Sequence, residues 1–300
     1  MEKKKRLAVQ YTVIAASLWG TIGVFVRALS AYGLTSLQLT VMRLLISAVL
    51  IGCYLGMKDR EKFRIRWKDI GWFFVTGVLC ILFFNVCYAI TIEKSSMSTA
   101  AVLLYTSPVI VTLVSIPVFG EMLTKRKCIA ILLAVTGCAL VSDIMQGNNA
   151  DFSGDVLLWG MGAAVGYAMY SVIARILLRR YQAITLLFYT FVTASVTGVF
   201  ICRIDQAIDI ILLHKDAGLI LFISALVCNT LPYFFYTNAL KNMEASQVSI
   251  LASIEPVVAT IIGIVFFGEP ITIYGIVGIL CVLSSIVVLN SSKQNGGILI

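Results

Sequence analysis

The second half of the chain repeats the first half at one constant spacing. Each residue of the first half has its counterpart 148 positions later, and no gap is needed between the first apolar segment and the last. Identical residues at this spacing include Ala15 and Ala163, Arg27 and Arg175, Cys80 and Cys228, Tyr88 and Tyr236, Pro108 and Pro256, and Gly120 and Gly268. A duplication in constant register restricts the chain to two copies of one folding unit.

Both copies consist of apolar segments long enough to cross a membrane. Of the 300 residues, 60% are hydrophobic and 13% are charged, whereas soluble domains carry about 25% charged residues. About 20 apolar residues span the hydrocarbon core as a helix, and a helix satisfies its own backbone groups in lipid. The pattern predicts an all-α integral membrane protein with ten transmembrane helices, numbered as spans 1 to 10: 9–28, 36–57, 69–90, 97–118, 127–145, 154–175, 184–203, 217–239, 246–267 and 271–290.

An odd number of spans in each copy makes the repeat inverted, because the second copy must enter the membrane from the opposite face. Inverted repeats are typical of secondary transporters, whose substrate site lies where the repeats meet. The predicted organisation is a first five-helix repeat over 1–145, an external linker over 146–153, a second, inverted five-helix repeat over 154–290 and a cytoplasmic tail over 291–300. We expect a central cavity between the two repeats.

The distribution of lysine and arginine predicts the orientation. Eighteen basic residues fall in the termini and loops on one side of the predicted bundle, four fall on the other side, and Arg43 lies inside span 2. Cytoplasmic loops carry the basic excess. We therefore predict a multi-pass protein of the inner (plasma) membrane with both termini in the cytoplasm. The net charge of +8 follows from these loops, so we expect no nucleic-acid partner.

Other classes of protein find little support in the sequence. The chain has neither a His-Glu-x-x-His motif nor a phosphate-binding loop, and its one histidine, His214, lies outside the spans. The eight cysteines lie in or at the ends of apolar spans without a C-x-x-C pair, so we expect no metal and no cofactor. A membrane enzyme lacks a candidate catalytic group, and a sensor or scaffold lacks a soluble output domain.

Each copy carries a set of short motifs, and proline followed by Phe-Gly-Glu is common to both. The first has Leu18-Trp19-Gly20, Arg43, and Pro108 followed by Phe-Gly-Glu at 119–121; the second has Glu255-Pro256 followed by Phe-Gly-Glu at 267–269. This set resembles the EamA-type carriers of the drug/metabolite transporter superfamily. The resemblance implies a ten-helix carrier that exports or exchanges small metabolites, commonly amino acids or related compounds. It also implies a cavity lined mainly by spans 1, 3, 4, 6, 8 and 9, which places Trp19 and its counterpart Tyr167 among the substrate-binding residues.

Polar side chains inside the spans provide the remaining binding candidates, because polar groups are costly in lipid. Spans 3 and 8 carry matching polar and aromatic stripes: Asn85 and Tyr88 in span 3, and Asn229, Tyr233 and Tyr236 in span 8. Tyr105 lies near the middle of span 4. These residues either line the cavity or form hydrogen bonds between helices.

Arg43 and Glu255 are charges within spans, and neither is repeated, since their counterparts are Phe191 and Ser107. An unpaired charge at such depth costs about 2.5–3.5 kcal/mol or more. We predict that they contact substrate or act as a proton or ion-pair switch; a structural pair within the bundle is the alternative.

The ends and bends of spans 4 and 9 carry further candidates. Pro108 and Pro256 free upstream carbonyl groups and are candidate hinges, although a fixed bend is equally compatible with them. Glu121 and Glu269 are expected to cap the helix that follows each of them, with a gating salt bridge as the alternative.

The sequence thus predicts a secondary transporter that exports a small metabolite, such as an amino acid or related compound, by alternating access. An importer or exchanger of a nucleoside, a drug-like molecule or a carboxylate is the alternative. The expected partners are the small-molecule substrate, the lipid bilayer and protons or another coupling ion. We expect a monomer or a weak homodimer.

Overall fold

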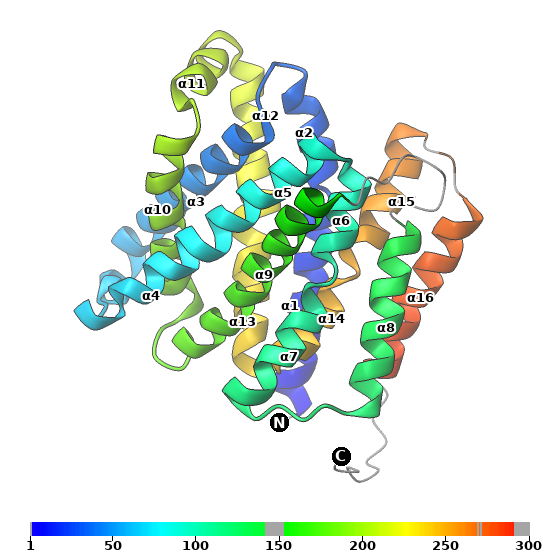
Figure 1. Cartoon of the computed structure of the whole chain (residues 1–300). Coiled ribbons are helices and arrows are strands. Elements are labelled where there is room, and N and C mark those ends of the chain that lie inside the picture. Colours follow the sequence, from blue (N-terminus) through cyan, green and yellow to red (C-terminus); the bar gives the residue numbers. More distant parts are fainter. Residues whose placement is uncertain (1, 142–152, 269, 271, 291–300) are drawn as a thin grey trace.

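The computed structural model describes residues 2–141, 153–268, 270 and 272–290, and within these ranges all regular structure is helical. Figure 1 shows one bundle of long helices. The α-helices are α1 (Glu2–Gly20), α2 (Ile22–Ser30), α3 (Ser36–Lys58), α4 (Ile70–Phe74), α5 (Phe83–Lys94), α6 (Met97–Leu104), α7 (Ser107–Phe119), α8 (Lys125–Val141), α9 (Gly154–Leu177), α10 (Ala183–Ile201), α11 (Ile204–Leu213), α12 (Lys215–Ala225), α13 (Leu231–Asn242), α14 (Ala245–Ala252), α15 (Glu255–Phe267) and α16 (Ile273–Asn290). Short 3₁₀ helices cover η1 (Arg60–Phe63) and η2 (Trp67–Asp69), and π-helical segments cover η3 (Val75–Leu82) and η5 (Leu226–Thr230).

Nine helical stretches of the described chain are long and apolar enough to cross a membrane. They are Lys3–Ser30, Ser36–Lys58, Trp67–Lys94, Met97–Phe119, Gly154–Leu177, Ala183–Ile201, Lys215–Asn242, Ala245–Phe267 and Ile273–Asn290. They coincide with nine of the ten predicted spans. The remaining predicted span, 127–145, falls on α8, which has 17 residues and ends where the described region ends.

Other predicted features lie partly or wholly outside the described residues. Of the linker 146–153, only Ser153 is described, and the predicted tail 291–300 and Glu269 are not. The two ends of the bundle are named from Figure 1: the upper end contains α2, α11 and the end of α15, and the lower end contains the turn between α7 and α8.

Spans 4 and 9 are each broken into two helices at equivalent places. The breaks separate α6 from α7 and α14 from α15, and Pro108 and Pro256 each occupy the second residue of the new helix. Proline is well accommodated there, because the first backbone N–H groups of a helix have no intrahelical acceptor. The prolines therefore start a helix after a turn instead of bending a continuous one.

The ends of these broken spans also match. α7 ends at Gly120 with φ 66° and α15 ends at Gly268 with φ 65°. This left-handed conformation terminates helices and favours glycine, which has no Cβ. The glycine of each Phe-Gly-Glu motif therefore ends its span and releases the chain into the next turn.

Helices α8 and α16 pack as a close pair at one side of the bundle (Figure 1). A Cβ atom on Gly137 would lie 2.8 Å from the carbonyl oxygen of Gly278, and a Cβ atom on Gly278 would lie 2.7 Å from the carbonyl oxygen of Gly137. Small residues allow helix backbones to approach in membranes. The two last helices of the predicted repeats are thus held together by their glycines.

Candidate functional site: a charged aromatic cavity

A cavity with two adjacent compartments lies inside the bundle. The larger compartment, of about 410 Å³, is lined by α1, α2, α6 and α15 and continues to Phe267 and Thr272 at the upper end. The smaller compartment, of about 190 Å³, is lined by α1, α2, α3, α5, α9, η5 and α13. Trp19, Tyr88 and Glu255 belong to the walls of both. Residues from both halves of the chain therefore enclose one interior space that reaches toward the upper end.

Most of the sequence-predicted site residues line this cavity or a small pocket of about 10 Å³ beside it. The lining residues among them are Trp19, Arg43, Asn85, Tyr88, Tyr105, Pro108, Tyr167, Asn229, Tyr233, Glu255 and Pro256. Tyr236 is fully buried behind this wall. The structure brings Arg43 and Glu255 to the same smaller compartment.

Glu255 is the first residue of α15 and lines both compartments and the small pocket. α1 approaches this point closely, because a Cβ atom on Gly20 would lie 3.0 Å from the Glu255 carbonyl oxygen. The glycine of the Leu18-Trp19-Gly20 motif thus allows the neighbouring Trp19 to stand beside this carboxylate. Among the described residues, Glu255 forms no ion pair with a basic side chain.

Arg43 is buried, with 7% of its surface exposed. Its Nε donates to the Leu39 carbonyl oxygen at 3.2 Å, and a terminal nitrogen lies 3.4 Å from the Thr40 hydroxyl oxygen. Both partners belong to its own helix, α3. Within the described part of the chain, no ion pair joins Arg43 to Glu255, so the guanidinium and the carboxyl group line the same compartment without direct contact.

Aromatic rings form the wall between these charges. The Trp19 ring lies 5.2 Å from the Tyr233 ring, 5.3 Å from the Tyr236 ring and 6.4 Å from the Tyr167 ring, measured between centroids. Such separations are typical of interacting aromatic pairs. Trp19 and Tyr167, which are counterparts in the two copies, therefore meet at the centre of the bundle.

Hydrogen bonds between helices hold part of this wall. The Tyr236 hydroxyl lies 2.8 Å from the Ser171 hydroxyl, and the Tyr170 hydroxyl lies 2.8 Å from the Thr237 hydroxyl; both contacts join α9 to α13. Asn229 donates to the Ser47 hydroxyl of α3 at 2.9 Å. Tyr236 and Asn229 thus make the interhelical contacts that were the alternative to cavity lining, and Asn229 lines the cavity as well. The sequence did not single out Tyr170, because this residue does not belong to a polar stripe that is matched in the other copy.

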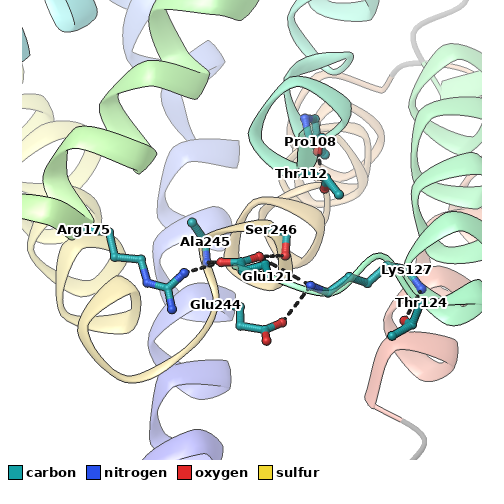
Figure 2. A network of polar contacts seen from close by, with 9 residues as sticks. All are labelled: Pro108, Thr112, Glu121, Thr124, Lys127, Arg175, Glu244, Ala245 and Ser246. Atoms are coloured by element: carbon teal, nitrogen blue, oxygen red, sulfur yellow. Dashed lines mark hydrogen bonds and ion pairs between the residues drawn. The ribbon is translucent and has the colours of Figure 1, made fainter. Parts of the chain in front are cut away.

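Glu121 is the centre of a polar cluster at the lower end (Figure 2). Its carboxylate accepts the Ala245 backbone N–H at 2.9 Å and the Ser246 hydroxyl, and it forms ion pairs with Lys127 and Arg175. Lys127 also lies 2.8 Å from a Glu244 carboxylate oxygen. The expected cap of the following helix is wrong: Glu121 caps α14, because the fold places the first turn of α14 beside the α7–α8 turn. We call Glu121, Lys127, Arg175, Glu244 and Ser246 the Glu121 cluster.

The cluster keeps Glu121 ionised. Burial alone raises the pKa of a carboxyl group, but the Ser246 hydrogen bond and the charges of Lys127 and Arg175 lower it, and the pKa of Glu121 is below its usual value. The sequence could not identify these partners, because Lys127 and Arg175 were counted only as loop charges. Their burial depends on how the ends of α8 and α9 pack.

A helical bundle with membrane-spanning apolar helices and a charged interior cavity belongs by class to the multi-pass membrane transporters. The family assignment follows from comparison with known proteins: the model of the EamA-like transporter family matches residues 6–143 and 155–291, so the chain belongs to this family. The uncharacterized transporter YwfM of Bacillus subtilis is 24% identical over 95% of this chain and 94% of its own length.

Two further relatives and one solved structure agree with this assignment. An uncharacterized transporter of Archaeoglobus fulgidus is 26% identical over 92% of this chain and 94% of its own length, and the uncharacterized inner membrane transporter YicL of Salmonella typhimurium is 24% identical over 94% of each chain. A crystal structure with 15% sequence identity superposes with a TM-score of 0.79, covering 94% of this chain and 96% of the other, and so shares the fold.

Proposed function

We propose that the protein is a secondary transporter that moves a small organic solute by alternating access between two inverted five-helix repeats. Two separate matches to the family model, one in each half, support the duplication. The equivalent helix breaks at Pro108 and Pro256 support it structurally. α8 then provides the tenth span, in the position that α16 occupies in the second repeat.

The observation that carries this proposal is one cavity with a fixed cation, a carboxylate and aromatic walls. Arg43 presents a guanidinium group and Glu255 a carboxylate to the same compartment, and within the described chain no ion pair joins them. A charge buried in a membrane protein is costly without a partner. A substrate with an anionic group for Arg43, a cationic amine for Glu255 and an apolar body for the rings would supply both partners. Amino acids and related metabolites have this chemistry.

The basic residues support an orientation and a membrane. The turns at the lower end include Lys125, Lys127, Arg179 and Arg180, and cytoplasmic loops carry the basic excess. The lower end, both termini and the Glu121 cluster are therefore assigned to the cytoplasm, and the cavity faces the outside. The relatives are bacterial and archaeal, which favours the plasma membrane. We propose export as the physiological direction.

Glu255→Gln tests the proposal. A metabolite panel first identifies a ligand by the thermal stabilisation it gives to the purified protein, because a ligand stabilises the state that binds it. Transport of that ligand into proteoliposomes should fall at least about tenfold in Glu255→Gln, which corresponds to about 1.4 kcal/mol, while the unfolding temperature changes little. Glu93→Gln, the same substitution at an exposed helix end, is the control. Wild-type transport by Glu255→Gln would contradict the assignment of Glu255.

A further inference from the structure

The Glu121 cluster ties together three separate parts of the chain at the lower end of the bundle. Glu121 follows α7, Lys127 lies in the first turn of α8, Arg175 lies in the last turn of α9, and Glu244 and Ser246 flank the start of α14 (Figure 2). The Glu121 and Lys127 side chains are 4% and 5% exposed. Separating either from its partners would leave a buried charge uncompensated, which is strongly unfavourable. These contacts therefore join the ends of α7, α8, α9 and α14 at the lower end.

One residue of α14, Ser249, lies between the cluster and the cavity. One helical turn beyond Ala245 on α14 lies Ser249, whose buried hydroxyl has no hydrogen-bond partner among the described residues. Ser249 lines the pocket of about 10 Å³ together with Tyr105, Tyr167 and Glu255. The cavity thus ends in a narrow pocket one turn from the cluster, and a buried hydroxyl without a partner there requires an explanation.

The upper end contains equivalent residues in an open arrangement. Arg27 and Ser98 are the counterparts of Arg175 and Ser246, and both line the larger compartment. Each arginine also stacks on the phenylalanine of the Phe-Gly-Glu motif from the other half: the Arg27 guanidinium lies 4.3 Å from the Phe267 ring centroid, and that of Arg175 lies 4.5 Å from the Phe119 ring centroid. The same arginine–phenylalanine unit is therefore found at both ends. At the upper end this unit lines the larger compartment, and at the lower end Arg175 forms an ion pair with the Glu121 carboxylate.

We propose that the Glu121 cluster is the lower gate of the substrate path, and that it opens by release of the α14 N-terminus from Glu121. Helix α14 is short, and the break before Pro256 separates it from α15. The N-terminus of α14 can therefore move while α15 stays in place. Loss of the Ala245 and Ser246 contacts would join the small pocket to the lower surface. This inference rests on the proposed alternating access, and it names the contacts that alternate.

Two reporter cysteines measure the two ends separately. The eight native cysteines are replaced, and Ser249→Cys or Ser98→Cys is introduced into the full chain. The rate of reaction with a small charged methanethiosulfonate is then measured in detergent without substrate. Glu121→Gln keeps the shape of the side chain and removes its charge. We expect it to increase the reaction rate at residue 249 at least tenfold and to decrease the rate at residue 98, because opening the lower gate closes the upper end.

Two further variants make the result specific. Asp155→Asn removes the Lys94–Asp155 ion pair of 2.7 Å at the upper end and should leave the rate at residue 249 unchanged. Arg175→Lys keeps the charge but loses the planar fork of the guanidinium, and should change both rates in the same directions as Glu121→Gln by a smaller factor.

Any result other than opposite changes at the two reporters would overturn the proposal. Equal increases at both would show general loosening, unchanged rates would show no gate, and failure of both cluster variants to fold would make the cluster a folding element. Opposite changes in a protein that transports none of the panel compounds would count against the proposed function and leave the gate standing.

Discussion

Removal of the hydroxyl group should have different effects at two tyrosines of α13, on stability at Tyr236 and on substrate binding at Tyr233. Tyr236 is fully buried, and its hydroxyl bonds to Ser171 of α9 at 2.8 Å. Tyr233 lines the smaller compartment, and its hydroxyl makes no hydrogen bond among the described residues. Tyr236→Phe should therefore weaken the α9–α13 contact, whereas Tyr233→Phe should weaken substrate binding.

The expected size of each effect follows from these contacts. Hydrogen bonds between membrane helices contribute about 0.6 kcal/mol on average and at most about 1.7 kcal/mol. This range corresponds to an increase of about three- to eighteenfold in the unfolding equilibrium constant. Because the Ser171 hydroxyl also lies 3.5 Å from the Tyr167 carbonyl oxygen, we expect the lower half of the range for Tyr236→Phe. Loss of one hydrogen bond to the substrate costs about 0.5–1.5 kcal/mol, so Tyr233→Phe should raise the dissociation constant about two- to twelvefold.

Reversible unfolding in mixed micelles measures the first quantity, and ligand titration monitored by tryptophan fluorescence measures the second. Tyr233→Phe should change the free energy of unfolding by less than about 0.5 kcal/mol, and Tyr236→Phe should leave the dissociation constant within about twofold. A destabilised Tyr233→Phe with normal binding would refute the placement of Tyr233 on the cavity wall. Equal loss of binding in both variants would refute the distinction between wall and support.

Further predictions concern packing, orientation and pH. Gly137→Ala should destabilise the protein by about 1–3 kcal/mol in the same unfolding assay, because the added methyl group would meet the Gly278 carbonyl oxygen at 2.8 Å; Gly56→Ala, where nothing lies within 4 Å, should not. Single cysteines at Lys68 and Gln206, both exposed, should react with an impermeant reagent from opposite sides of the membrane, and reaction from one side would contradict the orientation. The reaction rate at a residue-249 cysteine, normalised to unfolded protein, should be constant from about pH 5 to 8. Glu121 faces Lys127, Arg175 and Glu244, and its pKa is lowered from 4.5. Ionised Glu121 therefore stabilises the closed lower end at every pH above 4.5. This stabilisation is lost only as the pH falls below that value. An increase in rate near pH 7 would contradict it.

Several residues that the sequence singled out lie at the cavity, and the reason is physical. Polar groups in lipid are costly, so residues such as Arg43, Asn229 and Glu255 must face the interior, and the structure places all three at the cavity. The sequence predicted a hinge or a fixed bend at Pro108 and Pro256, whereas the structure begins a new helix one residue before each proline. The exact rotation of α13 was not predictable from spacing alone. Tyr236 follows Tyr233 by three residues, and this rotation moves it from the wall to the layer behind.

The sequence offered a salt bridge at Glu121 only as an alternative to capping, and it did not identify the partners Lys127 and Arg175. An ion pair between residues 54 positions apart, such as Glu121 with Arg175, depends on which helix ends meet in space. The only signal available was the repeat itself, because Arg175 has an identical counterpart in Arg27 whereas most other loop charges have none. An arginine retained in both copies indicates a function of the scaffold more than a function of orientation.

The residues that are repeated in both copies and those that are not suggest different roles, in movement of the scaffold and in recognition of the substrate. The features that are repeated, namely the helix breaks, the left-handed glycines and the arginine–phenylalanine contacts, are those that an alternating scaffold needs at both ends. The charges of the cavity are not repeated, because a substrate is asymmetric and one copy of each charge is enough to orient it. Lys127 is also unrepeated, since its counterpart is Gly275, so the lower end has a cation that the upper end lacks. Under the proposed alternating access, this extra cation favours closure of the lower end, and we infer that the protein without substrate rests with its cavity open at the upper end.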